Sequence, residues 1–208
     1  MNIKNITIKN RLIAGFSILA VLVMLVGGMS LRALYTATDG FAHYVNGINA
    51  RADVAAQIRT AVDRRAIAAR NLVLVTKPAD VELEKAEVTR AHEDVQARLK
   101  QLNDMLAAAT DTSEKARSLA AEMGRVEALY GPVATNIVGL ALAGKHEEAV
   151  QALDDQCRPL LAQLVKATDD YATYTAARRD EIVRADQASY QMQRDVLKIG
   201  RASCRERV

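Results

Sequence analysis

Residues 12–31 form an apolar run of twenty residues, LIAGFSILAVLVMLVGGMSL, which contains no charged side chain. A helix of this length spans about 30 Å, the thickness of the hydrocarbon core of a bilayer. Because lipid offers no hydrogen-bond partners, the backbone of such a segment must pair its polar groups internally, as a helix does. The run therefore predicts a transmembrane helix over residues 12–32, after a short segment at residues 1–11.

Basic side chains gather on one side of this run. Lys4, Lys9 and Arg11 precede it, whereas Arg32 alone follows it at once. The positive-inside rule then predicts a cytoplasmic N-terminus, with the rest of the chain outside. A cleavable signal peptide is the alternative, but its apolar core would have about 7–15 residues and would end in a small-residue cleavage site. The longer run and the sequence MSLR at its end favour a retained helix.

The remainder of the chain has the composition of long helices. The sequence contains no Trp, two Phe and three Pro, and it is rich in Ala, Leu, Val, Arg, Glu and Asp. Apolar residues spaced by three and four predict helices at about 33–76, 80–109, 113–143 and 159–198, with a short helical piece at 145–154. Short connections favour an up-down-up-down arrangement. The predicted fold class is all-α: an N-terminal transmembrane helix that continues into an antiparallel four-helix bundle over residues 33–198.

Two of these helices carry a regular apolar seam, which predicts their buried faces. The seams consist of Val88, Ala91, Val95, Leu99, Leu102 and Leu106 in the second helix, and of Ala116, Leu119, Met123, Val126, Tyr130, Val133, Ile137 and Leu140 in the third. Pro78 ends the first helix and Gly144 ends the third. We expect Asp80 to cap the second helix, and Asp111 with Glu114 to form a capping box before the third.

The last ten residues, 199–208, read IGRASCRERV and differ in composition from everything before them. They resemble a cloning or sequencing-adapter scar translated in frame, and such scars are excluded from fold reasoning. A native tail is the alternative. If the segment is a scar, the natural protein continues beyond Lys198.

The sequence carries no signature of an enzyme, a cofactor or a metal centre. A Cys-x-x-Cys-His haem motif, the Glu-x-x-His pairs of di-iron bundles, a P-loop and a Gly-x-Ser-x-Gly motif are all absent. We expect His43, His92 and His146 at the surface, and Cys157 as a buried, inert thiol. The net charge of +3 comes from interspersed acids and bases, so no nucleic-acid partner is expected.

The most informative polar segment is RTAVDRRAIAARN, residues 59–71. On a helical wheel its polar side chains form two stripes, Arg59, Asp63 and Arg70 on one and Arg64 and Asn71 on the other. Arg65 falls inside the apolar arc, where a guanidinium is costly unless it is paired or reaches an anion. Two interpretations remain open. Either Asp63 pairs with its neighbouring arginines while Arg65 extends along a helix–helix edge, or the arginines form an anion site.

Antiparallel geometry supplies residues for such a site. If the first and fourth helices have similar lengths, residues 59–64 lie level with about 167–172, which brings in Thr168, Tyr171 and Tyr174. Hydroxyls and an aromatic edge opposite two or three arginines would suit a small carboxylate. A purely structural role for Tyr174 remains open as well.

The chain also resembles a known family. A basic N-terminus, a membrane helix and a helical bundle follow one another, with AARNLVLVTKPAD at 68–80 and GKHEEAVQAL at 144–153. In this order they resemble the N-terminal sensory part of bacterial methyl-accepting chemotaxis proteins with a four-helix-bundle ligand-binding domain. The resemblance covers residues 1 to about 198.

This resemblance implies a homodimer in the bacterial inner membrane with the bundle in the periplasm. It implies a small amino acid or organic acid as ligand at the dimer interface. The corresponding ligand-binding residues would be Arg64, Arg65, Arg70, Asn71, Thr168, Tyr171 and Tyr174. The signal would pass through a second membrane helix and a HAMP module to a cytoplasmic coiled coil that controls a histidine kinase, all absent from this chain. The arginine spacing is not that of the aspartate receptors, so the ligand stays open.

Two other functions remain open. The same bundle could serve a sensor histidine kinase or a cyclic-dinucleotide enzyme, because the output module decides between them. It could also be a membrane-anchored adaptor without a small ligand. A bundle whose arginines are all paired with carboxylates would favour the adaptor.

Overall fold

In the computed structural model, the described backbone covers residues 8–205, and the described side chains are those of residues 8–194 apart from 11, 43 and 193. Every regular element within this range is helical. The elements are α1 (Ile8–Tyr44), η2 (Val45–Asn49), α2 (Ala50–Leu74), α3 (Pro78–Ala108), α4 (Glu114–Leu142), α5 (His146–Ala152), η3 (Leu153–Cys157) and α6 (Arg158–Arg205). The chain divides into two units, one ending at Val45 and the other beginning at Asn46.

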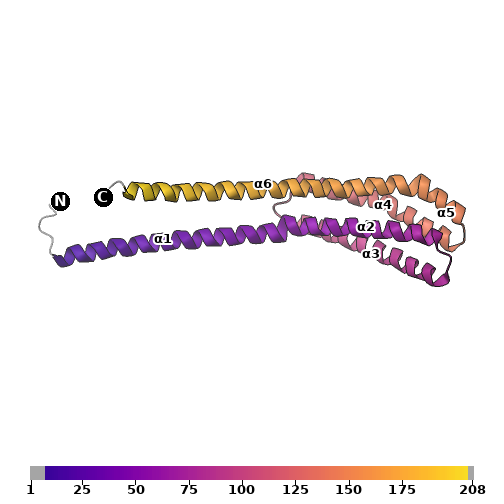
Figure 1. The fold of residues 1–208 in the computed structure, drawn as a ribbon, viewed down its shortest axis with the longest axis horizontal. Coiled ribbons are helices and arrows are strands. Elements are labelled where there is room, and N and C mark those ends of the chain that lie inside the picture. The colour runs from indigo at the N-terminus through magenta and orange to yellow at the C-terminus, as the bar shows by residue number, and fades with distance from the viewer. Residues whose placement is uncertain (1–7, 206–208) are drawn as a thin grey trace. The chain divides into compact units, whose positions relative to one another are not determined.

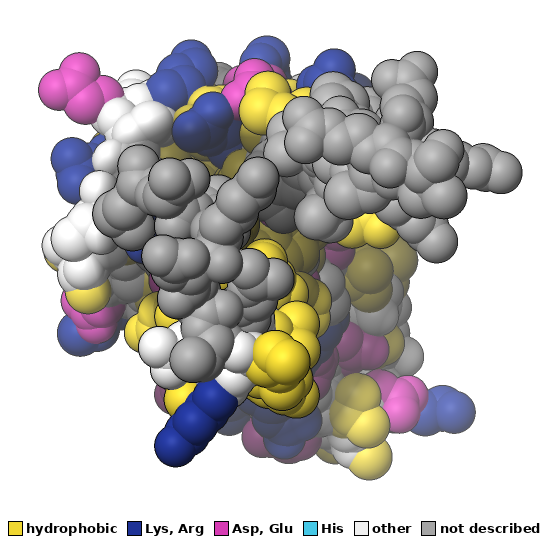
Figure 2. All heavy atoms as spheres, turned by 90° about the vertical axis from the view of Figure 1, so that its left-hand side faces the viewer, with side chains coloured by type: hydrophobic (Ala, Val, Ile, Leu, Met, Phe, Trp, Pro, Cys, Tyr) yellow, Lys and Arg dark blue, Asp and Glu magenta, His cyan; other side chains and the backbone are white. Residues whose placement is uncertain are grey.

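The first unit consists mainly of α1, an unbroken helix that contains the predicted membrane segment (Figure 1). Its apolar side chains are open to the surroundings, as Phe16, Met24 and Met29 are at 66%, 71% and 74% exposure. Figure 2 shows hydrophobic side chains open on the face that it draws. Exposure of so large an apolar surface to water is energetically unfavourable. By length and composition, α1 is able to cross a bilayer. The predicted apolar helix is confirmed, whereas its orientation and retention stay predictions.

The second unit is an antiparallel bundle of α2, α3, α4 and α6, with α5 and η3 in the connection between α4 and α6 (Figure 1). Each of the four long helices contributes side chains that solvent does not reach, among them Ile58, Leu102, Met123 and Leu164. The predicted all-α bundle is therefore confirmed. The predicted domain limits at 32/33 and 198/199 stay predictions; α6 continues to Arg205, and residues 1–7 and 206–208 lie outside the described range.

The two predicted seams differ in outcome. All six residues of the seam in α3 are buried, as predicted. In α4, Leu119, Val133 and Leu140 are only half-buried, while Ala120 and Glu127 are buried beside the seam. The reason is that α4 packs against α2, α3 and α6 together, so its buried face is wider than a two-position seam.

The capping box predicted for the third helix is wrong. Because α4 begins at Glu114, its N-cap is Ser113, whose Oγ accepts a hydrogen bond from the backbone N–H of Ala116 at 3.1 Å. Asp111 instead accepts hydrogen bonds from Nη1 and Nη2 of Arg51, at 3.1 and 2.9 Å. The turn between α3 and α4 is thus tied to the start of α2.

Of the other two predicted helix ends, the cap at Asp80 is wrong and the end at Gly144 is confirmed. Since α3 begins at Pro78, Asp80 lies within its first turn and is not the cap, which corrects that prediction. The carboxylate there still favours the positive end of the helix dipole. Gly144 follows the end of α4 with φ of 74°, a left-handed conformation that glycine adopts without strain. Cys157 is buried as predicted, with its Sγ 3.8 Å from the hydroxyl of Tyr130.

Candidate functional site

The predicted arginine segment lies in the second half of α2, and its side chains reach three different neighbours. Arg59 pairs with Asp63 at 3.0 Å, which confirms one of the predicted ion pairs. Its Nη1 also lies 2.7 Å from Asp169 and 3.5 Å from the carbonyl oxygen of Val165, both on α6. Residue 59 therefore lies level with 165–169, close to the register that we predicted.

Arg64 points to α3. Its Nε donates to Glu87 at 2.7 Å and its Nη1 donates to Asp94 at 2.9 Å. The hydrogen bond with Glu87, and next the one with Asp94, raise the pKa of Arg64 above its ordinary value. The guanidinium therefore bridges two carboxylates on one face of α3 and is already occupied by them.

Arg65 lies in the core, completely buried, as its place on the helical wheel predicted. Its Nη1 and Nη2 donate to the two carboxylate oxygens of Glu127 on α4, at 2.7 and 2.6 Å. Its guanidinium carbon lies 4.7 Å from the ring centre of Tyr130. The interpretation that Arg65 extends along a helix–helix edge is therefore wrong, because a buried carboxylate balances its charge.

Two residues of α3 complete this cluster. His92 is half-buried and its Nδ1 lies 2.9 Å from Nη1 of Arg65. Gln96 donates from Nε2 to Oε1 of Glu127 at 3.0 Å. We call Arg65, His92, Gln96, Glu127 and Tyr130 the Arg65 layer. It joins α2, α3 and α4 through polar contacts, with Arg65, Glu127 and Tyr130 buried in the core, His92 half-buried and Gln96 exposed.

We predicted that all three histidines lie at the surface, and of the two whose side chains are described, one does. His92 corrects the prediction, since it lies one position from Ala91 in the seam and turns toward Arg65. His146 is exposed as predicted, and its Nδ1 lies 3.2 Å from the carbonyl oxygen of Val73. The side chain of His43 lies outside the described residues.

Arg70 and Asn71 lie near the far end of α2. Asn71 donates from Nδ2 to Glu84 of α3 at 3.0 Å. Arg70 is exposed, and the structure gives it no ion pair within the described residues. It shares its outward face with Ile67 and Leu74, which are 57% and 76% exposed. Of the predicted arginines, Arg70 is the one open to a ligand or a partner.

The predicted residues of α6 face other neighbours. The hydroxyl of Thr168 donates to Val165 within its own helix. Tyr171 is buried, and burial is the main cause that raises its pKa from 10.0 to about 12. The hydroxyl of Tyr174 lies 2.6 Å from Oγ of Ser113 in the α3–α4 turn. The structure thus does not bring the seven predicted residues together in one cavity.

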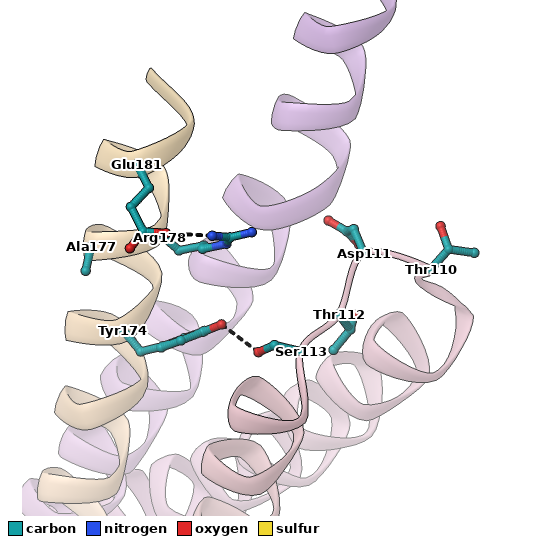
Figure 3. Close-up of a pocket in the computed structure, with 8 residues that line it drawn as sticks. All are labelled: Thr110, Asp111, Thr112, Ser113, Tyr174, Ala177, Arg178 and Glu181. Atoms are coloured by element: carbon teal, nitrogen blue, oxygen red, sulfur yellow. Dashed lines mark hydrogen bonds and ion pairs between the residues drawn. The ribbon is translucent and has the colours of Figure 1, made fainter. Parts of the chain in front are cut away.

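A cavity of about 520 Å³ lies between the α3–α4 turn and α6. Figure 3 shows Tyr174 reaching Ser113 across it and Arg178 lying beside Glu181 on α6. The sequence offered no signal for it, because most of its lining residues are exposed and they are irregularly spaced. Its charged groups are already paired, Arg178 with Glu181 at 2.6 Å and Asp111 with Arg51 at 2.9 Å.

The described elements form a helical bundle, which is preceded in the sequence by an apolar helix long enough to cross a membrane. The family model described as a four helix bundle sensory module for signal transduction matches residues 5–190. The chain belongs to this family, which confirms the family assignment made from the sequence. No curated protein matches the chain.

Proposed function

We propose that this sensory module is the ligand-binding region of a bacterial methyl-accepting chemotaxis receptor that responds to a small carboxylate. Membership of the sensory-module family and the apolar helix that precedes the bundle support this proposal. The basic residues before the helix favour a cytoplasmic N-terminus and a periplasmic bundle in the inner membrane. In this proposal the chain is a receptor and not an enzyme, and it acts without a cofactor.

The observation that carries the proposal is a row of regularly spaced residues along the outward face of α2. Its residues are spaced by four and three in alternation: Ala56, Thr60, Asp63, Ile67, Arg70 and Leu74. This is the spacing with which helices pack against each other, yet among the described residues no other helix covers the exposed part of the row. The row therefore fits the α2 of a second copy, and the proposed receptor is a homodimer.

Pairing of two such rows would bring Arg70 from both copies to one interface. The guanidinium of Arg70 has no carboxylate partner within the described part of the chain, and such a group is suited to bind the carboxylate of a ligand. Arg64 and Arg65 are engaged with Glu87, Asp94 and Glu127, so we assign them to the bundle's stability. Arg70, with Asn71 beside it, is the part of the predicted site that we retain.

Ligand binding can be tested by thermal denaturation of the 208-residue chain in detergent micelles. A ligand at a hundred times its Kd stabilises the folded state by about 2.7 kcal/mol. We expect an organic acid or amino acid, such as succinate or L-aspartate, to raise the Tm. The effect should disappear in Arg70→Ala and persist in Arg117→Ala, an exposed arginine on α4. If no compound of a broad organic-acid and amino-acid panel raises the Tm, the proposed ligand class is wrong.

One observation favours the adaptor alternative. Arg51, Arg59, Arg64 and Arg65 are all paired with carboxylates of their own chain. Loss of every ligand response, together with a dimer that Ile67→Asp disrupts in sedimentation measurements, would support an anchored bundle without a small ligand. Sequencing of the source gene beyond codon 198 separates a chemotaxis receptor from a sensor kinase or cyclic-dinucleotide enzyme.

A further inference from the structure

The Arg65 layer contains a histidine, His92, in direct contact with an arginine. Histidine changes its charge between about pH 5 and 8, whereas arginine stays charged throughout this range. Burial and the neighbouring thiol of Cys157 raise the pKa of Tyr130, so its phenol remains neutral. His92 is also the half-buried member of the layer, while Arg65 and Glu127 are closed to solvent.

The contact between Arg65 and His92 fixes the role of each atom. A guanidinium has only N–H donors, so Nδ1 of His92 must accept the hydrogen bond of 2.9 Å from Nη1. The imidazole is then neutral and carries its proton on Nε2. A protonated imidazole has two donors and no acceptor, so it cannot keep this contact. Two positive charges would then face each other at hydrogen-bond distance.

The surroundings of His92 hold charges on both sides. From α2, Arg65 faces the ring, and Arg64 pairs with Glu87 and Asp94 of α3, the helix that carries His92. From α4, the carboxylate of Glu127 lies at the other side of Arg65. A Cβ at position 131 would lie 3.3 Å from Oε1 of Glu127 and 3.6 Å from Cε1 of His92, so the ring and the carboxylate border one small space.

Glu127 has little capacity left for a second cation. Its Oε1 already accepts from Arg65 and from Gln96, and its Oε2 accepts from Nη2 of Arg65. In addition, the buried Nε of Arg65 has no hydrogen-bond partner in the described part of the chain. A charged His92 would compete with Arg65 for the same carboxylate. Loss of one contact therefore unsettles the packing of α2, α3 and α4 together.

We propose that protons are a second stimulus for this module, and that His92 is the residue that detects them. Protonation of His92 ends its hydrogen bond with Arg65 and loosens α3 from α2. Protonation costs the folded bundle this contact with Arg65, which the unfolded chain does not make, so the bundle loses stability when His92 gains a proton. The response is independent of Arg70 and of any carboxylate ligand.

The test compares three forms of the 208-residue chain in detergent micelles: the unchanged chain, His92→Gln and His146→Gln. The amide oxygen of a glutamine at 92 can accept from Arg65 but does not titrate. Between about pH 7.5 and 5, we expect the unfolding equilibrium constant of the unchanged chain to rise about tenfold. His146→Gln should behave in the same way, and His92→Gln should lose most of this dependence.

Ring nitrogen chemical shifts of ¹⁵N-histidine provide a readout that does not require a variant to fold. At pH 8 we expect His92 to carry its proton on Nε2, and on acidification amide exchange in α3 should accelerate around residue 92. The proposal is overturned if His92 carries its proton on Nδ1. An acid response of equal size in a folded His92→Gln would also overturn it. Loss of the carboxylate response alone, with the acid response intact, would contradict the Arg70 proposal and not this one.

Discussion

Arg65 and Glu127 stand 62 residues apart in the sequence and meet in the core through two hydrogen bonds of 2.7 and 2.6 Å. Their side chains are 1% and 3% exposed. A buried ion pair adds little net stability over a well-packed apolar pair, but removal of one partner leaves an unbalanced charge in the core.

Glu127→Leu should therefore destabilise the bundle by about 3–5 kcal/mol, because it strands the guanidinium of Arg65. Urea unfolding followed by far-ultraviolet circular dichroism measures the effect. The double variant Arg65→Met with Glu127→Leu should recover most of the loss, since no charge is then left unpaired. A double variant as unstable as the single one would show that the pair itself, and not the isolated charge, sets the stability.

A pair of glycines on α4 allows a matched test of the space around the Arg65 layer. Glycine to alanine in an exposed helix interior usually gains about 0.5–1 kcal/mol. We expect this gain for Gly139→Ala, because an added Cβ there meets nothing within 4 Å. Gly131→Ala should gain less or lose stability, because its Cβ would lie 3.3 Å from Oε1 of Glu127. Equal gains would mean that the carboxylate can shift freely.

Alkaline pH should unfold the bundle through its buried tyrosines. Burial raises the pKa of Tyr171 from 10.0 to about 12 and also raises that of Tyr130. In the unfolded chain these phenols ionise near their ordinary value. The folded state therefore loses stability as the pH rises from about 10 toward 12.

The near-ultraviolet absorbance of tyrosinate reports this directly. The buried Tyr130 and Tyr171 should ionise only together with the loss of helicity. Tyr171→Phe should shift alkaline unfolding to higher pH. A single smooth titration, with helicity unchanged, would contradict the buried positions.

The success of the α3 seam and the failure of the predicted site have one physical explanation. Periodicity reports which face of a helix is apolar, so it correctly placed all six seam residues of α3 in the core. It also placed Arg65 on the inner face of α2. Periodicity could not identify Glu127 as buried. A glutamate next to an apolar seam has the same sequence pattern whether it faces solvent or pairs with a buried arginine on another helix. The small residues around it, Ala120, Gly131 and Ala134, were the available signal for a bulky polar layer.

The predicted residues do not form one site because the axial register of two helices and the rotation of each helix about its own axis are separate properties. The helix lengths predicted the axial register of α2 and α6, and the contact of Arg59 with Asp169 agrees with that register. Facing depends on the rotation of each helix about its axis, which lengths do not determine. Tyr171 therefore points into the core near Arg51, and Tyr174 reaches the α3–α4 turn, while Arg70 points outward from α2.

The unbroken course of α6 has a mechanical consequence. Between Pro159 and Gly200 its sequence contains neither glycine nor proline, the residues at which helices most often bend sharply. Past Ile182 its described side chains are exposed to solvent. Such a helix is stiff along its whole length. A displacement of α6 at the contact between Asp169 and Arg59 therefore moves Tyr190 as well, because the helix contains no hinge residue between them.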